Sequence, residues 1–168
     1  MKFSHLRLVL LMVLALFAFG CNGKRVAIVN TDSVYKSSAA SEKGSEYLKS
    51  LSAGMQAKYE AGQAKIQTAK NKEDKAAAEA EMQMILIELQ QRSNAEQQQV
   101  VMVLSEAYKK AMDNCRVKGG FDLIIPSEAA LAYDEAIDLT TKVIEEMNAM
   151  PIAFTPIEPE APAEQPAK

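Results

Sequence analysis

The chain has 168 residues, no tryptophan, a single histidine and a formal net charge of −3 at pH 7. The histidine, His5, lies in an N-terminal segment built like an export signal, so the exported protein has no imidazole for catalysis or metal binding. Removing Lys2 and Arg7 with that segment leaves 17 basic against 22 acidic residues, a net charge of −5, which gives no case for nucleic-acid binding. We therefore expect no enzyme activity, no metal and no cofactor.

Residues 1–20 are predicted to be a signal peptide. Lys2 and Arg7 precede an apolar run from Leu8 to Phe19. Because a membrane span needs roughly 20 apolar residues, this run is short for a permanent anchor. The segment ends at Gly20, a small residue that suits cleavage by a signal peptidase.

Cys21 follows the predicted cut and resembles the lipobox cysteine of bacterial lipoproteins, which is acylated. We therefore expect a lipid anchor on the periplasmic side of the bacterial cell envelope. Asn22 lacks the aspartate that marks inner-membrane retention in some bacteria, which favours the outer membrane. Two alternatives stay open: cleavage that leaves Cys21 as a free thiol, and an uncleaved N-terminal anchor.

Residues 21–35 are expected to give the first strand of a small body. The run Val26–Asn30 is short and β-branched, and polar residues bound it, as is typical of a strand. Thr31, Asp32 and Ser33 then supply helix-capping side chains, so we expect a helix to begin near Ser33.

Residues 36–117 are predicted to form one helical hairpin. The region has no proline, is rich in strong helix formers, and carries one narrow apolar stripe in each half. A straight helix of about 80 residues would extend roughly 120 Å and separate the strands at its two ends. We therefore expect the helix to turn back near residues 70–76, where Lys70–Lys75 is the most polar stretch.

Residues 118–150 are predicted to complete the body. Gly119 and Gly120 stop the helix, Phe121–Ile125 reads as a strand, and Ala130–Tyr133 is a weaker extended candidate. A last short helix is expected to start at Asp138 or Thr140, whereas residues 151–168 are proline-rich and are expected to be a disordered tail. A body of this size is expected to self-associate. The residues predicted for its core or subunit contacts are Val26, Ile28, Phe121, Leu123, Ile125 and Leu131.

This order of elements resembles the Skp family of periplasmic chaperones, also called the OmpH family. The matching stretches are KRVAIVNTDSVY before the arm and KGGFDLIIPSEAALAYDEAIDLTTKVI after it, and the resemblance spans residues 24–147. It implies an α+β fold with a small β-sheet body and a long antiparallel helical arm. It also implies a homotrimer whose arms enclose unfolded outer-membrane proteins without ATP, that is, a holdase chaperone.

Such a chaperone needs flexible apolar side chains that hold clients weakly. The candidates are Met55, Met82, Met84, Ile85, Leu86, Ile87 and Met102. The plainer interpretation is that most of them seal the two arm helices together. Because residues 84–87 wrap about 300° of a helix, one seam cannot bury all four. Residues 90–99, rich in amides, interrupt the second stripe and are expected to be loosely packed and flexible.

The predicted tip of the arm is basic, with Lys65, Lys70, Lys72 and Lys75. These lysines would attract acidic clients or anionic lipid headgroups, or would simply solvate a turn. The alternative to a chaperone is a structural coiled-coil envelope lipoprotein that tethers or spaces envelope layers.

Overall fold

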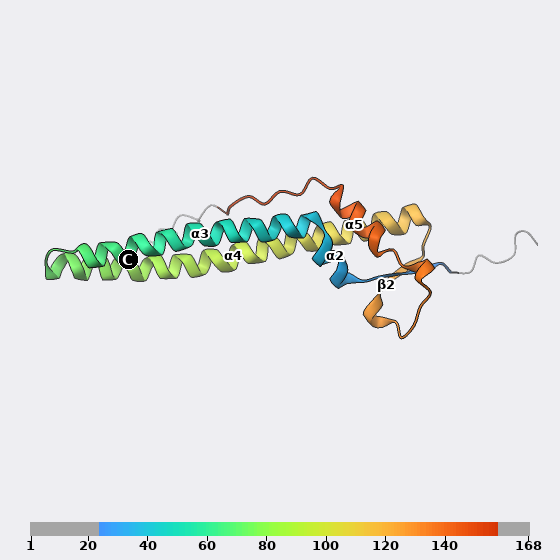
Figure 1. The fold of residues 1–168 in the computed structure, drawn as a ribbon, viewed down its shortest axis with the longest axis horizontal. Helices are drawn as coiled ribbons and strands as arrows, with labels where there is room; N and C mark the ends of the chain where they lie inside the picture. Colours follow the sequence, from blue (N-terminus) through green and yellow to red (C-terminus); the bar gives the residue numbers. More distant parts are fainter. Residues whose placement is uncertain (1–23, 158–168) are drawn as a thin grey trace, which may run out of the picture.

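The computed structural model describes residues 24–157. A long helical hairpin of α3 (Ala39–Thr68) and α4 (Lys72–Gly119) projects from a small body at one end (Figure 1). The body contains β1 (Val26–Val29), α2 (Thr31–Ser37), β2 (Leu123–Pro126), two short 3-10 turns at Ser127–Ala129 and Glu135–Ile137, and α5 (Thr140–Asn148). The predicted α+β class, with a sheet body and a helical arm, is confirmed.

The sheet joins two strands that flank the entire arm. β1 and β2 pair in parallel, with Val26 opposite Leu123 and Ile28 opposite Ile125. On its other side, β1 is bonded to the chain before α5, where the Leu139 amide donates to the Ile28 carbonyl at 2.8 Å. A parallel pair needs a long crossover, and here the hairpin is that crossover. The prediction of a strand at Ala130–Tyr133 is wrong, because the bridge at Asp138 takes that place.

The core of the body lies between the sheet and three helices. Ala27 and Val29 from β1 pack with Val34 of α2, with α5 and with the last turns of α4. The buried residues contributed by the other helices include Ala107, Ala111, Cys115, Val143 and Met147. Of the six residues predicted for the core, only Ile28 is fully buried and Phe121 packs partly against the core.

The residues predicted on β1 and those of the main core cluster lie on alternate faces of the strand, although Ile28 is buried as well. Side chains alternate along a strand, so choosing Val26 and Ile28 instead of Ala27 and Val29 exchanges the two faces of the sheet. Leu123 is half exposed and Leu131 is fully exposed in this single chain, so neither belongs to its core. Val26 and Ile125 are partly buried.

The helix after β1 begins earlier than predicted and is broken. Asn30, not Ser33, is the N-cap of α2, because its side chain accepts a bond from the Ser33 amide at 2.8 Å. Ser38 then adopts an extended conformation, ends α2 and caps α3 through the Ser41 amide. The break lets α2 bury Val34 in the body while α3 leaves in the direction of the arm.

The two arm helices meet in a short turn at residues 69–71. Asn71 caps α4 by accepting a bond from the Asp74 amide at 2.7 Å. At the body end, α4 closes on Gly120, whose φ of +64° is the left-handed conformation that glycine adopts readily. α3 has 30 residues and therefore extends the arm about 45 Å from the body.

Candidate functional site

Four of the predicted client-binding residues point outward from α4. Met84, Leu86, Ile87 and Met102 are exposed, Met84 by 68% of its surface. The structure adds Val101, which is 66% exposed and which sequence analysis missed because it lies in the amide-rich half of α4. These side chains are available for contact with another molecule.

Most of these outward residues share one face of α4. Met84 and Met102 are 18 residues apart, which is five turns at 3.6 residues per turn, and Ile87 and Val101 fall within about 100° of them. The residues that pack on α3, such as Met82 and Val100, lie on the opposite side of the helix. The outward stripe, defined here as Met84, Ile87, Val101 and Met102, therefore follows the side of the arm away from α3.

Met82 and Ile85 are buried in the seam of the arm. Both are buried against α3, where Gly62 admits them: a Cβ at Gly62 would lie 2.8 Å from Met82 Sδ and 3.2 Å from Ile85 Cδ1. Their spacing of three residues keeps both on the seam while Met84 and Ile87 turn away. For these two, the burial supports the plainer interpretation that they seal the arm. Met55 is partly buried.

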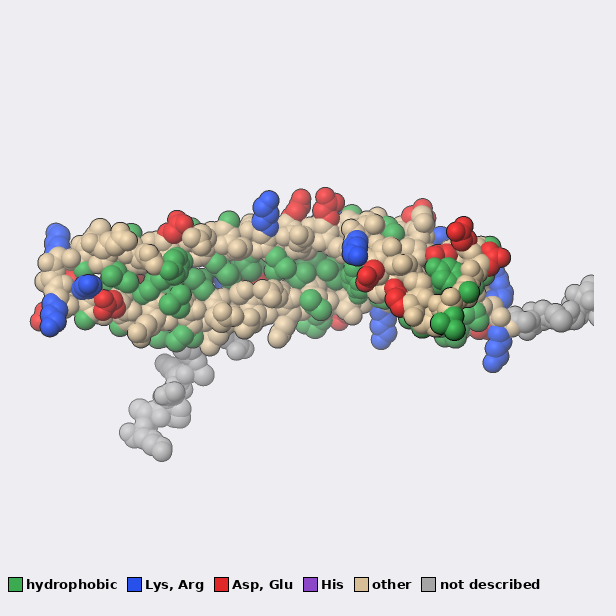
Figure 2. Space-filling model, turned by 60° about the horizontal axis from the view of Figure 1, so that its bottom comes forward, with side chains coloured by type: hydrophobic (Ala, Val, Ile, Leu, Met, Phe, Trp, Pro, Cys, Tyr) green, Lys and Arg blue, Asp and Glu red, His purple; other side chains and the backbone are tan. Residues whose placement is uncertain are grey.

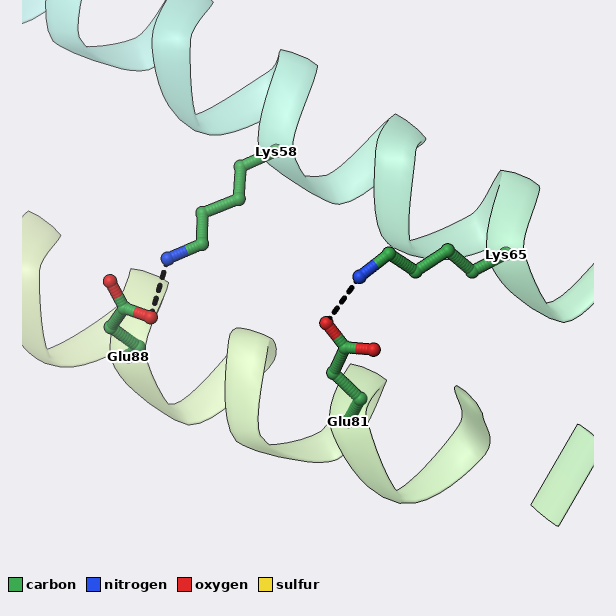
Figure 3. A network of polar contacts seen from close by, with 4 residues as sticks. All are labelled: Lys58, Lys65, Glu81 and Glu88. Carbon is green, nitrogen blue, oxygen red and sulfur yellow. Dashed lines mark hydrogen bonds and ion pairs between the residues drawn. The ribbon is translucent and has the colours of Figure 1, made fainter. Parts of the chain in front are cut away.

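The tip half of the arm is also joined by two exposed ion pairs between the helices (Figure 3). Lys58 Nζ lies 2.5 Å from Glu88 Oε2, and Lys65 Nζ lies 2.5 Å from Glu81 Oε1. Lys65, predicted as part of a basic tip, is therefore paired across the arm.

The other predicted tip lysines lie at the turn. Lys70, Lys72 and Lys75 are exposed and adjoin Glu73 and Asp74, and Figure 2 shows positive and negative side chains together at this end. The tip is thus mixed in charge, with an excess of lysine.

A buried carboxylate lies in the body half of the arm, where the sequence suggested loose packing. Glu96 of α4 is fully buried. Its Oε2 accepts a hydrogen bond from the Tyr47 hydroxyl of α3 at 2.6 Å, and Arg92 Nε lies 3.6 Å from its Oε1. Burial, followed by the hydrogen bond and the charge of Glu96, raises the pKa of Tyr47 to about 12. The expectation of loose packing at residues 90–99 is wrong at Glu96.

Residues 151–157 complete this cluster and do not form a detached tail. After α5 the chain runs back along the arm (Figure 1). Phe154 stacks on Tyr47 with ring centroids 5.8 Å apart, and the Ile157 amide donates to Glu96 Oε1 at 3.0 Å. The predicted disordered tail is therefore wrong for residues 151–157, and the rest of that prediction lies outside the described residues.

Apolar side chains also mark the outer surface of the body. A shallow open groove there is lined by Met112, Leu123 and Ile124 together with charged residues of α4. Hydrophobic side chains gather at the body end and follow the arm between its helices (Figure 2). Leu123 is half exposed and Leu131 is fully exposed at this surface, so neither is part of a core within one chain.

The two cysteines differ in what the structure says of them. Cys115 is buried in the body core, and burial raises the pKa of its thiol. Cys21, the predicted lipidation site, lies outside the described residues. Within residues 24–157, no cluster of His, Cys, Asp or Glu side chains is arranged to hold a metal ion. No helix of that part of the chain is both long and apolar enough to cross a membrane.

Comparison with known proteins gives one family and one fold. The family described as outer membrane protein (OmpH-like) matches residues 25–147. Among solved structures, the chain is similar to a candidate outer membrane chaperone (OmpH-like) from Caulobacter crescentus CB15. The TM-score is 0.58 at 14% identity, and the match covers 77% of this chain and 87% of that one. No curated protein sequence matches the chain.

Proposed function

Because the chain belongs to the OmpH-like family, we propose that it is an ATP-independent chaperone of the bacterial periplasm. It holds unfolded envelope proteins, above all outer-membrane proteins, between the helical arms of an oligomer. Membership of this family supports a periplasmic chaperone role in general. The observation that carries it is the outward stripe on α4.

The stripe has the chemistry of weak and general binding. Methionine side chains are flexible and polarisable, so they adapt to many apolar partners. Each side chain buried by a client contributes about 1–2 kcal/mol, and a stripe of four holds an unfolded segment without fixing its conformation. A protein that only spaces envelope layers would gain no stability from apolar side chains that are exposed to water.

The oligomer proposed is a homotrimer with the bodies in contact. The exposed Leu123 and Leu131 support contact between bodies, because apolar side chains of this size are more stable when covered. Three arms would then surround a cavity into which the α4 stripes point. Cys21 is proposed to carry a lipid, which would place the body beside the outer membrane, since four residues separate Cys21 from Val26.

The test is suppression of aggregation of a urea-denatured outer-membrane protein diluted into buffer without nucleotide. We expect the purified protein to suppress light scattering, and a variant with Met84→Gln, Ile87→Gln and Met102→Gln to need about tenfold more protein. The matched control places glutamines on exposed alanines of α3: Ala53→Gln, Ala57→Gln and Ala64→Gln. It should behave as the unchanged protein.

Equal activity of the two glutamine variants would remove the stripe from the mechanism. No suppression by the unchanged protein, together with one stoichiometric folded partner in a pull-down, would favour the tether. Native mass determination of the exported protein is expected to give a trimer with acylated Cys21, and a Cys21→Ser variant should leave the membrane fraction.

A further inference from the structure

A second surface of the arm is already covered by a segment of the same chain. Residues 151–157, named the strap here, lie along the middle of the arm in an extended course without helix or strand. Ile152 packs against the body core, and Phe154 reaches the seam between α3 and α4. The surface under the strap, named the strap groove, is built from Gly44, Tyr47, Glu96, Gln99 and Val100.

The strap groove recognises peptide backbone as well as one ring. Glu96 Oε1 accepts the Ile157 amide at 3.0 Å. With its amide nitrogen turned toward them, Gln99 donates to the Thr155 carbonyl at 3.1 Å and to Glu96 Oε2 at 3.3 Å. Every residue except proline offers both backbone groups, so these bonds do not depend on the sequence of the segment bound.

The groove is shaped for an aromatic side chain. Phe154 stacks on Tyr47 with an angle of 23° between the rings. Gly44 makes room for it, since a Cβ there would lie 3.2 Å from Phe154 Cζ and 3.1 Å from Val100 Cγ1. The groove is therefore specific for an extended chain that carries one aromatic ring.

The polar part of the groove also contains contacts in which the strap takes no part. Glu96 is fully buried and keeps the Tyr47 hydroxyl at 2.6 Å. Arg92 Nε is buried 3.6 Å from Glu96 without a hydrogen bond of its own among the described residues. A carboxylate held in this way retains lone pairs for a further donor, which the strap supplies.

The strap itself is held by few contacts. Pro151, Ala153, Thr155, Pro156 and Ile157 are exposed. Beyond Pro156 the surface continues toward the tip as a cavity of about 290 Å³ lined by Leu51, Met55, Leu89 and Arg92. A longer extended segment entering in place of the strap would find further apolar contacts there.

We infer that the strap groove is a binding site for extended polypeptide segments that carry an aromatic residue, and that the strap occupies it as an internal competitor. The inference rests on the proposed chaperone function and names a second client site with its recognition chemistry. The outward stripe binds any apolar segment, whereas the strap groove selects an aromatic one and opens only when the strap leaves.

The strap weakens binding of other segments in proportion to its occupancy. A site that is free for a tenth of the time binds its ligand about tenfold more weakly than a site that is always free. Loosening the strap should therefore strengthen binding of an outside peptide, although no contact with that peptide is added.

The probe is a fluorescein-labelled peptide with the sequence of residues 149–160, titrated into the purified full chain and followed by anisotropy. Two variants loosen the strap by independent routes: Phe154→Ala removes the ring, and Ile157→Pro removes the amide that Glu96 accepts. We expect each to bind the peptide about tenfold more tightly than the unchanged protein. Thr155→Ala, whose side chain is exposed, is the matched control and should bind as the unchanged protein does. A peptide with alanine in place of phenylalanine should bind no variant.

Equal dissociation constants for the unchanged protein and both loosened variants would overturn the inference, as would tight binding of the peptide that lacks phenylalanine. The outcome is separable from that of the proposed function. Suppressed aggregation without strap-dependent peptide binding leaves the chaperone and removes the groove. Strap-dependent peptide binding without suppressed aggregation leaves the groove and removes the chaperone.

Discussion

The tip half and the body half of the arm join the same two helices in different ways. Near the tip, Lys58–Glu88 and Lys65–Glu81 cross the seam in water, with the side chains roughly half exposed. Near the body, Glu96 is fully buried and depends on groups from α3 and the strap. Each half thus has a carboxylate that binds a group of α3 across the seam. In the tip half it is exposed to solvent, whereas in the body half it is buried.

This difference determines which half of the arm tolerates substitution. Exposed ion pairs contribute little because water replaces them at small cost. A buried carboxylate ties its partners together, because each partner lost leaves a buried polar group without a bond. The tip half should therefore tolerate substitution and bend, while the body half should respond strongly at a few positions.

The largest expected effect comes from removing the buried carboxylate. Glu96→Ala should lower the free energy of unfolding by about 3 kcal/mol, because it leaves a small cavity and takes away the acceptor of the Tyr47 hydroxyl and the Ile157 amide. Glu88→Ala, its counterpart at the tip, should cost less than about 1 kcal/mol. Urea unfolding at one fixed protein concentration measures both, and equal losses would erase the distinction between the halves.

A smaller effect is expected at two glycines of α3. A methyl group at Gly44 meets Val100 and Phe154, whereas nothing lies within 4 Å of one at Gly54. Gly54→Ala should stabilise the protein by up to about 1 kcal/mol through helix propensity alone. Gly44→Ala should lose that gain to crowding and destabilise the protein by about 1 kcal/mol.

Thermal unfolding measures both alanine variants. The two results can be compared directly, because the same substitution is made at both positions. If both alanines stabilise the protein, the seam at Gly44 is looser than its geometry implies. If Gly44→Ala destabilises the Phe154→Ala variant less than it destabilises the unchanged protein, part of the crowding comes from the strap.

The hairpin was predictable from sequence because every local signal agrees with it. The middle of the chain has no proline and two apolar stripes, and the flanking strands gain stability only by pairing with each other. The break at Ser38 was not predictable, because serine is tolerated in helices and only the docking of Val34 in the body decides it. The buried face of β1 was likewise hidden, since all four of its residues are apolar.

The Glu96 cluster escaped prediction for a different reason. Tyr47 and Glu96 are 49 residues apart, and Glu96 is surrounded in the sequence by amides that indicate a solvated helix. The strap is a similar case: its composition suggests disorder, but the Phe154 ring, the Ile157 amide and the apolar Ile152 dock it. Composition averages over a segment, whereas docking depends on a few groups.

The smallest effect expected concerns one hydroxyl in the body half, and it changes with pH. Tyr47→Phe keeps the ring under Phe154 and should cost about 1 kcal/mol at neutral pH for the lost bond to Glu96. Because the pKa of Tyr47 is raised from 10.0 to about 12 in the folded protein, the bond contributes fully below pH 10. Its contribution is lost as the pH rises from about 10 to about 12. The unfolding free energies of the unchanged protein and Tyr47→Phe should therefore converge over that interval. If the difference in unfolding free energy between the unchanged protein and Tyr47→Phe instead stays constant with pH, the hydroxyl does not hold Glu96. The body half would then be as loosely joined as the tip.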